Sequence, residues 1–199
     1  LDVSRGTIII NGNGKAQQNR EGTSRYDIYS YDLQEGITLV QSNPDTSFRI
    51  SVDSRDDGQK GPDIRVRLHG INIGWKQMSI RSRDNVILEL AAGTENCCNK
   101  LDYRNMDEES GSSQESSLLI TGTGKLTVNS FEGPAIAVNR NLIIESGQIT
   151  VSTADGESPV IGIKPSLSPY DGCENIQIQS GAQVTALGGC MAVGTSQNG

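Results

Sequence analysis

Residues 118–128 read LLITGTGKLTV, residues 141–153 read NLIIESGQITVST, and residues 175–189 read NIQIQSGAQVTALGG. The three stretches share one pattern: aliphatic residues alternate with polar ones, a corner of small residues follows, and a second alternating run begins. Alternation with a period of two predicts β-strands with one buried face. These stretches therefore predict strands that pack an aliphatic side inward and leave a polar side outward.

The corners consist of Gly122-Thr123-Gly124, Ser146-Gly147 and Ser180-Gly181. They lack the Asn-Gly or Asp-Gly pair that is typical of a two-residue hairpin, so each strand is expected to bend and continue. Repetition of one unit at roughly twenty to thirty residues is typical of a solenoid. We therefore predict an all-β parallel β-helix (β-solenoid) with loop insertions, in which inward Ile, Val and Leu stack from turn to turn.

The same pattern occurs earlier in the chain, where residues 64–73 read IRVRLHGINI. Ile64, Val66 and Leu68 alternate with arginines, and after the His69-Gly70 corner the inward positions change to Ile71 and Ile73. A strand, a corner and a second strand are therefore predicted here as well.

The length of 199 residues is enough for one domain with a sizeable core. We predict a single β-solenoid domain over residues 1–199. Its first part, 1–60, is expected to be an irregular N-terminal cap that opens with a strand at Ile8–Ile10. Residues 61–199 are expected to form the regular turns, with a polar, Ser-rich insertion at 99–117.

The net charge of −7 excludes classes of partner that require clustered Lys and Arg, namely nucleic acid and anionic membrane surfaces. No run approaches eighteen consecutive apolar residues, so no transmembrane helix and no membrane insertion are expected. The chain begins at Leu1 and shows no signal peptide, and we interpret it as a mature or excised segment.

Four cysteines occur, at Cys97, Cys98, Cys173 and Cys190. An even number in a Gly- and Ser-rich β chain favours disulfides and an oxidising, extracellular compartment. Cys173 and Cys190 are about one turn apart, and stacking could bring them together. Cys97 and Cys98 could each bridge to a distant partner or to each other. Four free thiols are the alternative.

Three aromatic residues are candidates for carbohydrate contacts, because an exposed aromatic ring can stack on a sugar. Tyr29 and Tyr31 share one parity of a predicted strand, and Trp75 follows the parity of Ile71 and Ile73. The alternative is that the two tyrosines cover an open edge of the core and that Trp75 belongs to the edge of the core.

A weak candidate for a Ca²⁺ site is the acidic loop that contains Asp53, Asp56, Asp57 and Asp63. Clustered carboxylates can supply some of the six to eight oxygens that Ca²⁺ prefers. The spacing of an EF-hand is not met, because Arg55 occupies the third position. The alternative is a solvated acidic loop.

Catalysis is not expected. Asp45, Asp57 and His69 echo the order of the motifs of β-helical polysaccharide hydrolases, but they lie about twelve residues apart, which is less than one turn. They would occupy different faces, whereas a working pair of carboxylates must share one surface at about 5 to 10 Å. No nucleophile-elbow, zinc-protease or phosphate-loop motif occurs.

Residues 66–73, 88–96, 118–126 and 176–186 match, in this order, the phrases I-T-L-D-G-V-N-I, L-x-L-x-G-x-N, L-T-I-x-G-x-G-x-L and I-x-I-x-G-G-x-V-x-A. In this series the chain resembles the carbohydrate-binding-domain-type parallel β-helix proteins of bacterial cell surfaces. The resemblance implies a right-handed parallel β-helix, secretion, and recognition of a polysaccharide or cell-surface glycan, in some members with Ca²⁺. The cysteines and the insertion at 99–117 depart from the pattern, and no binding residue of the family maps onto this chain.

The sequence thus favours a non-catalytic extracellular surface or matrix module that binds carbohydrate. The alternative is a structural subunit that stacks end to end on copies of itself into a fibre by continued strand pairing. A polysaccharide lyase or hydrolase is the third hypothesis.

Overall fold

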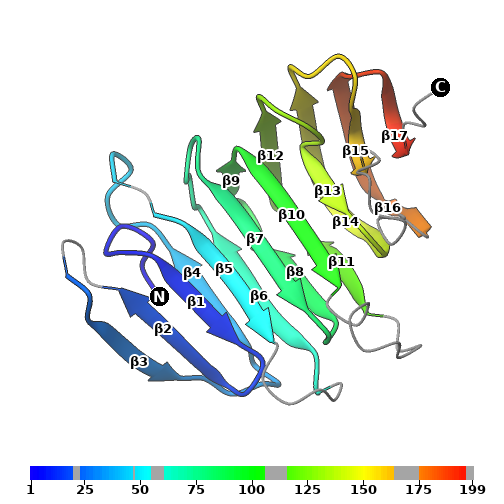
Figure 1. Cartoon of the computed structure of the whole chain (residues 1–199). Coiled ribbons are helices and arrows are strands. Elements are labelled where there is room, and N and C mark those ends of the chain that lie inside the picture. Colours follow the sequence, from blue (N-terminus) through cyan, green and yellow to red (C-terminus); the bar gives the residue numbers. More distant parts are fainter. Residues whose placement is uncertain (20–22, 47, 55–60, 106–115, 164–174, 196–199) are drawn as a thin grey trace.

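The computed structural model describes residues 1–19, 23–46, 48–54, 61–105, 116–163 and 175–195, and it is all-β: these residues contain no helix. The strands stack side by side along the molecule, with the first strands, β1 to β3, at one end of the stack and the last strand, β17, at the other (Figure 1). Among the described residues no helix is therefore long and apolar enough to cross a membrane.

The strands of the first half of the stack are β1 Ile8–Asn11, β2 Lys15–Asn19, β3 Tyr26–Ser30, β4 Ile37–Val40, β5 Ile50–Ser54, β6 Ile64–His69, β7 Gln77–Ser82, β8 Val86–Leu90 and β9 Glu95–Cys98. The second half contains β10 Lys100–Asn105, β11 Ser117–Gly122, β12 Lys125–Ser130, β13 Ile136–Val138, β14 Asn141–Thr153, β15 Pro159–Ile163, β16 Asn175–Gly188 and β17 Met191–Thr195.

The strands form two sheets. One has the order β17-β15-β13-β10-β7-β5-β1-β2-β3, and the other has the order β4-β6-β8-β11-β14-β12-β9, with β16 paired to β14. Only the pairs β1–β2 and β2–β3 are antiparallel, and every other pair is parallel. Parallel pairing without helices requires each strand to return to the sheet after the chain has visited other strands.

The second sheet is curled, because β14 and β16 are long strands that bend at their corners. The first half of β14 pairs with β11 and its second half pairs with β12, and β16 follows β14 through both halves. The outer side of this sheet is therefore divided by the small-residue corners into two surfaces, one on the β11 side and one on the β12 side of the bend. The expectation that strands bend and continue at Ser146–Gly147 and Ser180–Gly181 is confirmed.

Turns that lie entirely within the described residues have nearly constant length. Ile64 pairs with Val86, Leu126 with Ile149, and Ile136 with Ile161, so these turns contain 22, 23 and 25 residues. This agrees with the period predicted from the repeated pattern. Larger separations, of 28 residues or more, occur where the chain includes residues 55–60, 106–115 or 164–174, which lie outside the described residues.

The core is a column of aliphatic side chains between the sheets. In the 64–73 segment, the alternation changes parity at the Gly70 corner as predicted, and all five inward residues are buried: Ile64, Val66, Leu68, Ile71 and Ile73. Among the described residues Tyr103 is the largest fully buried side chain, and its hydroxyl shares a hydrogen bond of 2.7 Å with Ser116 Oγ. Thin, branched side chains fill most of the space, which explains why so few aromatic residues are needed.

The N-terminal segment differs from the expected division at residue 61. The strands β1, β2 and β3 form an antiparallel meander at one end of the nine-stranded sheet, and its Ile8, Ile10 and Ala16 are fully buried. However, β4 and β5 already pair in parallel with β6 and β7. Regular pairing therefore begins near residue 37, and polar loops between these strands concealed it.

The insertion expected at 99–117 is also narrower than predicted. β10 lies inside this range and pairs with β7 over six residues. Its sequence, KLDYRN, alternates inward Leu101 and Tyr103 with outward charged residues. The charged residues concealed the alternation, since they belong to the solvent side of an ordinary strand.

Candidate functional site

Strand register lines up polar side chains on one outer face of the curled sheet. We call it the ladder face and define it by Glu95–Cys98, Lys125–Ser130, Gln148–Thr153 and Gln183–Gly188. One column runs through Glu95, Lys125, Gln148 and Gln183, and a second runs through Cys97, Thr127, Thr150 and Thr185. Neighbouring members of a column are separated by the strand spacing of about 4.8 Å.

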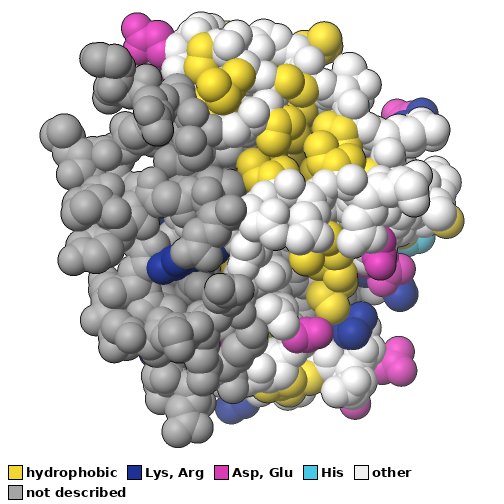
Figure 2. All heavy atoms as spheres, turned by 90° about the vertical axis from the view of Figure 1, so that its right-hand side faces the viewer, with side chains coloured by type: hydrophobic (Ala, Val, Ile, Leu, Met, Phe, Trp, Pro, Cys, Tyr) yellow, Lys and Arg dark blue, Asp and Glu magenta, His cyan; other side chains and the backbone are white. Residues whose placement is uncertain are grey.

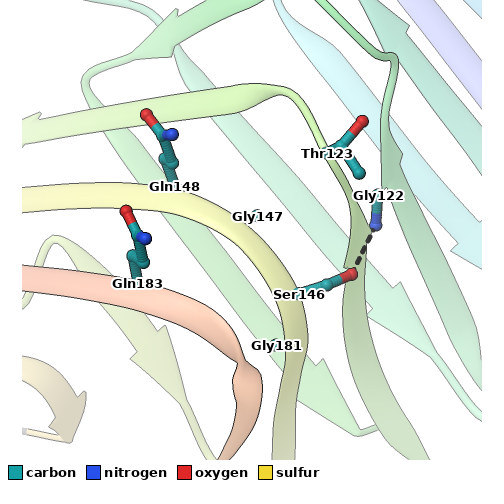
Figure 3. A pocket seen from close by; sticks show the side chains of 7 residues that line it. All are labelled: Gly122, Thr123, Ser146, Gly147, Gln148, Gly181 and Gln183. Carbon is teal, nitrogen blue, oxygen red and sulfur yellow. Dashed lines mark hydrogen bonds between the residues drawn. The ribbon is translucent and has the colours of Figure 1, made fainter.

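The part of the ladder face on β14 and β16 carries neutral groups that are open to solvent. Gln148, Thr150, Gln183 and Thr185 are all exposed. Figure 3 shows the Gln148 and Gln183 side chains one above the other, pointing to the same side of their strands. An amide offers two donors and an acceptor, and a hydroxyl offers one donor and two lone pairs, so these columns are rows of hydrogen-bonding groups.

The columns border a hollow of about 180 Å³ at the stacked corners. It is lined by Gly122, Thr123, Ser146, Gly147, Gln148, Gly181 and Gln183 (Figure 3). The glycines provide the space, because they have no side chain where the strands bend. The hollow therefore continues the glutamine column around the edge of the ladder face.

Hydrogen bonds fix the corner that forms one wall of this hollow. The Gly122 N–H donates to Ser146 Oγ at 2.9 Å, and the Thr121 hydroxyl donates to Glu145 Oε2 at 2.6 Å. Gly122 has φ +102°, and a Cβ at this position would overlap the Leu90 carbonyl oxygen. Only glycine fits where backbone approaches backbone this closely.

Toward β9 the ladder face is charged rather than neutral. Lys125 Nζ lies 2.8 Å from Glu95 Oε1, and both side chains are exposed. The hydrogen bond and the positive charge of Lys125 lower the pKa of Glu95. The face thus changes from an ion pair on β9 and β12 to amides and hydroxyls on β14 and β16.

The three aromatic candidates lie apart. Trp75 is 71% exposed and Lys76 Nζ lies 4.1 Å from the centre of its ring, so the alternative that it belongs to the edge of the core is not met. It lies in the turn before β7, two residues after Ile73, whose N–H donates to the Cys97 carbonyl of the ladder face. Continued alternation from Ile71 and Ile73 would direct Trp75 inward, but the turn directs its indole to solvent.

Tyr29 and Tyr31 lie at the other end of the nine-stranded sheet. Tyr29, on β3, is 38% exposed. Tyr31 is partly buried against the core, as the edge-covering alternative expects, and its hydroxyl donates to the Asn11 carbonyl at 2.7 Å. Burial and the charge of Asp84 raise the pKa of Tyr31 to about 12. Tyr29 is therefore the more accessible ring of this pair.

The proposed Ca²⁺ residues are only partly described. Asp56 and Asp57 lie outside the described residues, and Asp63 accepts a hydrogen bond of 3.0 Å from Asn85 Nδ2. Asp53 belongs to β5. Within the described ranges no group of three His, Cys, Asp or Glu side chains could hold a metal ion, and the Ca²⁺ site stays a prediction.

Cys97, Cys98 and Cys190 carry free thiols, and Cys173 lies outside the described residues. The predicted bridges to Cys190 and between Cys97 and Cys98 are thus not formed. Cys98 points into the core while Cys97 points outward, because neighbours in a strand face opposite sides. Burial raises the pKa of Cys98 to about 12, with a contribution from Cys97.

A protein-family model described as carbohydrate-binding domain-containing protein matches residues 34–185. The chain belongs to this family. All seven residues that line the corner hollow fall inside the matched segment of this carbohydrate-binding domain. A comparison with curated proteins and one with solved structures found no match.

The glutamine and threonine columns of this carbohydrate-binding domain were not found from the sequence. Gln148 and Gln183 are 35 positions apart, and nothing in the sequence alone fixes their register, because residues 164–174 separate the two turns. The available signal was the recurrence of Lys125, Gln148 and Gln183 directly before the second run of each repeated unit.

Proposed function

We propose that the domain binds a polysaccharide or cell-surface glycan on the ladder face, with the sugar units lying across the strands. The observation that carries this proposal is the in-register pairing of Gln148 with Gln183 and of Thr150 with Thr185 beside the corner hollow. Glycan hydroxyls both donate and accept hydrogen bonds, and exposed amides and hydroxyls offer the complementary groups without a buried charge.

The shape of the face favours an extended chain over a small ligand. The hollow of about 180 Å³ is below the roughly 300–1,000 Å³ of ordinary small-molecule pockets, so it can hold only part of a longer molecule. The outward polar side chains of each column follow one another at about 4.8 Å along the stack, so successive units of a polymer can each meet a hydrogen-bonding group. Trp75 at the border of the face adds an exposed ring that can pack on a sugar.

Three further properties belong to the same proposal. The parallel register of both sheets and the nearly constant turn length support a parallel β-helix, and its right-handed form is our proposal from the resemblance described above. The module is proposed to be secreted and non-catalytic. Its ladder face supports a non-catalytic role, because Glu95 is engaged by Lys125 and the other groups of the two columns are amides, hydroxyls and a thiol.

The test is a glycan array followed by calorimetry with the glycan that binds best. A Gln148→Ala/Gln183→Ala double variant removes the amides, and we expect affinity to fall about fivefold or more, since two hydrogen bonds are worth about 0.5–1.5 kcal/mol each. Gln177→Ala is the matched control, because Gln177 is an exposed glutamine of β16 before its corner, outside the ladder face. A double variant that binds like the wild type would refute the assignment of the face.

A second candidate function is end-to-end association of copies. Ile178, Leu187, Met191 and Val193 on β16 and β17 are exposed, and Figure 2 shows hydrophobic side chains gathered at this end of the stack. The edge strands of the nine-stranded sheet, β17 and β3, run in the same direction because two antiparallel pairings separate β3 from β1. A copy could therefore extend this sheet with parallel pairing.

Light scattering over a range of concentrations tests this candidate. Association should raise the mean mass with concentration, with and without reductant, and Val193→Lys should abolish the increase by placing a charge on the edge strand. A monomer at every concentration would exclude the candidate, while glycan binding would remain to be tested separately.

A further inference from the structure

We propose that the chain has a second sugar site, separate from the ladder face, which accepts a single pyranose ring of a glycan. The site is a pocket of about 320 Å³ near the N-terminal end of the stack. It is lined by Arg5, Gln18, Asn19, Asp27 and Tyr29. All five residues precede the segment 34–185 that matches the carbohydrate-binding family, so the family does not account for the pocket.

The antiparallel meander assembles this pocket from residues that are distant in the sequence. On neighbouring strands β2 and β3, Gln18 pairs with Asp27, and Ala16 pairs with Tyr29. Gln18 and Asp27 thus lie side by side, and Tyr29 follows two residues along the same face of β3. The segment before β1 supplies Arg5, and the Gln18 amide donates at 2.5 Å to the Asp2 carbonyl of that segment.

The lining has the chemistry of a sugar site. The Tyr29 ring is partly exposed and offers a flat apolar surface for the C–H side of a pyranose. Gln18 and Asp27, which pair across β2 and β3, place an amide and a carboxylate on the same face as the ring. A few convergent polar groups beside one aromatic ring are typical of small-ligand pockets.

The charges at the pocket set the orientation of the ligand. The Arg5 side chain is 78% exposed and Nε lies 3.7 Å from Asp2 Oδ2, so its outward N–H groups can reach a ligand at the mouth. Gln18 is held against the backbone and is 4% exposed, so it forms the floor. A ligand ring is therefore expected to stack on Tyr29 with hydroxyls toward Asp27 and Arg5.

The volume favours one ring. It lies at the lower end of the range for small-ligand pockets and exceeds that of the corner hollow, which supports a ligand of monosaccharide size. The two sites thus differ in what they accept: the ladder face takes an extended chain, and the pocket takes a terminal or branching unit.

The experiment is saturation-transfer difference NMR with the methyl glycosides of glucose, galactose, mannose, N-acetylglucosamine and glucuronic acid. We expect at least one glycoside to bind the wild-type chain, and Tyr29→Leu to weaken it about fivefold to tenfold by removing the aromatic surface. Tyr26→Leu is the matched control, because Tyr26 is an exposed tyrosine of opposite parity on the same strand. It should leave the dissociation constant unchanged.

Two further variants keep the outcomes distinct. Arg5→Ala changes an exposed side chain and should also weaken binding, which covers the case in which Tyr29→Leu does not fold. The Gln148→Ala/Gln183→Ala double variant should bind the glycoside normally even if it has lost the polymer. The proposal is overturned if no glycoside binds, if Tyr26→Leu and Tyr29→Leu weaken binding equally, or if the double variant alone abolishes it.

Discussion

The two sides of the same strands have opposite chemistry. On β12 and β14, the inward residues Leu126 and Ile149 are buried and stack along the core. Directly before each of them, Lys125 and Gln148 point outward and are exposed. One backbone register therefore builds both an aliphatic column and a polar column with the same spacing. The comparison shows that stability depends on the inner column, while the outer column is open to substitution and to ligands.

The sharpest test of this division compares neighbours on β14. Ile149→Ala should lower the free energy of unfolding by about 2–5 kcal/mol, because it removes buried methyl groups and leaves a cavity. Thr150→Ala, one residue further and exposed, should change it by less than about 0.5 kcal/mol. Urea denaturation followed by circular dichroism measures both values. Equal losses would contradict the division into a structural side and an open side.

The corners are predicted to be the next most sensitive positions. Gly122→Ala should cost at least about 2 kcal/mol, because φ is +102° and the new Cβ would overlap the Leu90 carbonyl oxygen. Gly147 has the same φ, but the nearest atom to its Cβ would be the end of the Leu90 side chain at 3.1 Å, and the backbone oxygens of Gly122 and Gly124 would lie at 3.4 Å, an ordinary contact distance. Gly147→Ala should therefore cost less in the same denaturation experiment. The reverse order would show that side-chain packing, not the backbone, limits the corner.

The adjacent cysteines Cys97 and Cys98 allow the inward and outward sides of β9 to be compared by the rates at which their thiols are alkylated. Cys98 points inward and its pKa is raised to about 12 by burial, whereas Cys97 points outward and is partly exposed. At pH 8, iodoacetamide should modify Cys97 in a Cys98→Ser variant at least about tenfold faster than Cys98 in a Cys97→Ser variant. Mass spectrometry measures both rates. Denaturant should make them equal, and equal rates in the native state would contradict the burial of Cys98.

The smallest effect is expected at the exposed ion pair of the outer column. Lys125 lowers the pKa of Glu95, so the contribution of the pair is present above the ordinary pKa of a glutamate and is lost as the pH falls through the lowered value. Lys125→Met should raise the pKa of Glu95 toward its ordinary value, as measured by NMR titration of the carboxyl carbon. An unchanged pKa would show that the pair is not formed in solution.

The sequence predicted the strands and the corners well because they depend on local pattern. The inward residues of 64–73 and the bends in β14 and β16 follow from alternation and small residues alone. β10 was not predicted, because charged residues occupy its outward positions and only Leu101 and Tyr103 mark the inward side. Pattern reading thus fails where the polar side of a strand dominates the composition.

The candidate sites depended on register and could not be predicted in the same way. The glutamine column requires the alignment of turns that are separated by residues 164–174. The N-terminal pocket combines Arg5 with residues of two antiparallel strands, and only Tyr29 among its lining was singled out by residue type. The parity that Trp75 shares with Ile71 suggested the edge of the core as the alternative to a sugar contact, but a turn begins at Gly74 and directs the ring to solvent.

The nearly constant length of the turns that lie within the described residues means that the stack can lengthen or shorten by whole turns. Since one turn adds one strand to each face, duplication or loss of 22 to 25 residues changes the length of the stack by a fixed step of about 4.8 Å. Adding or removing a whole turn therefore keeps the strand pairing of the other turns unchanged. The length of the face that can contact a polymer therefore changes by one strand spacing for each turn added or lost.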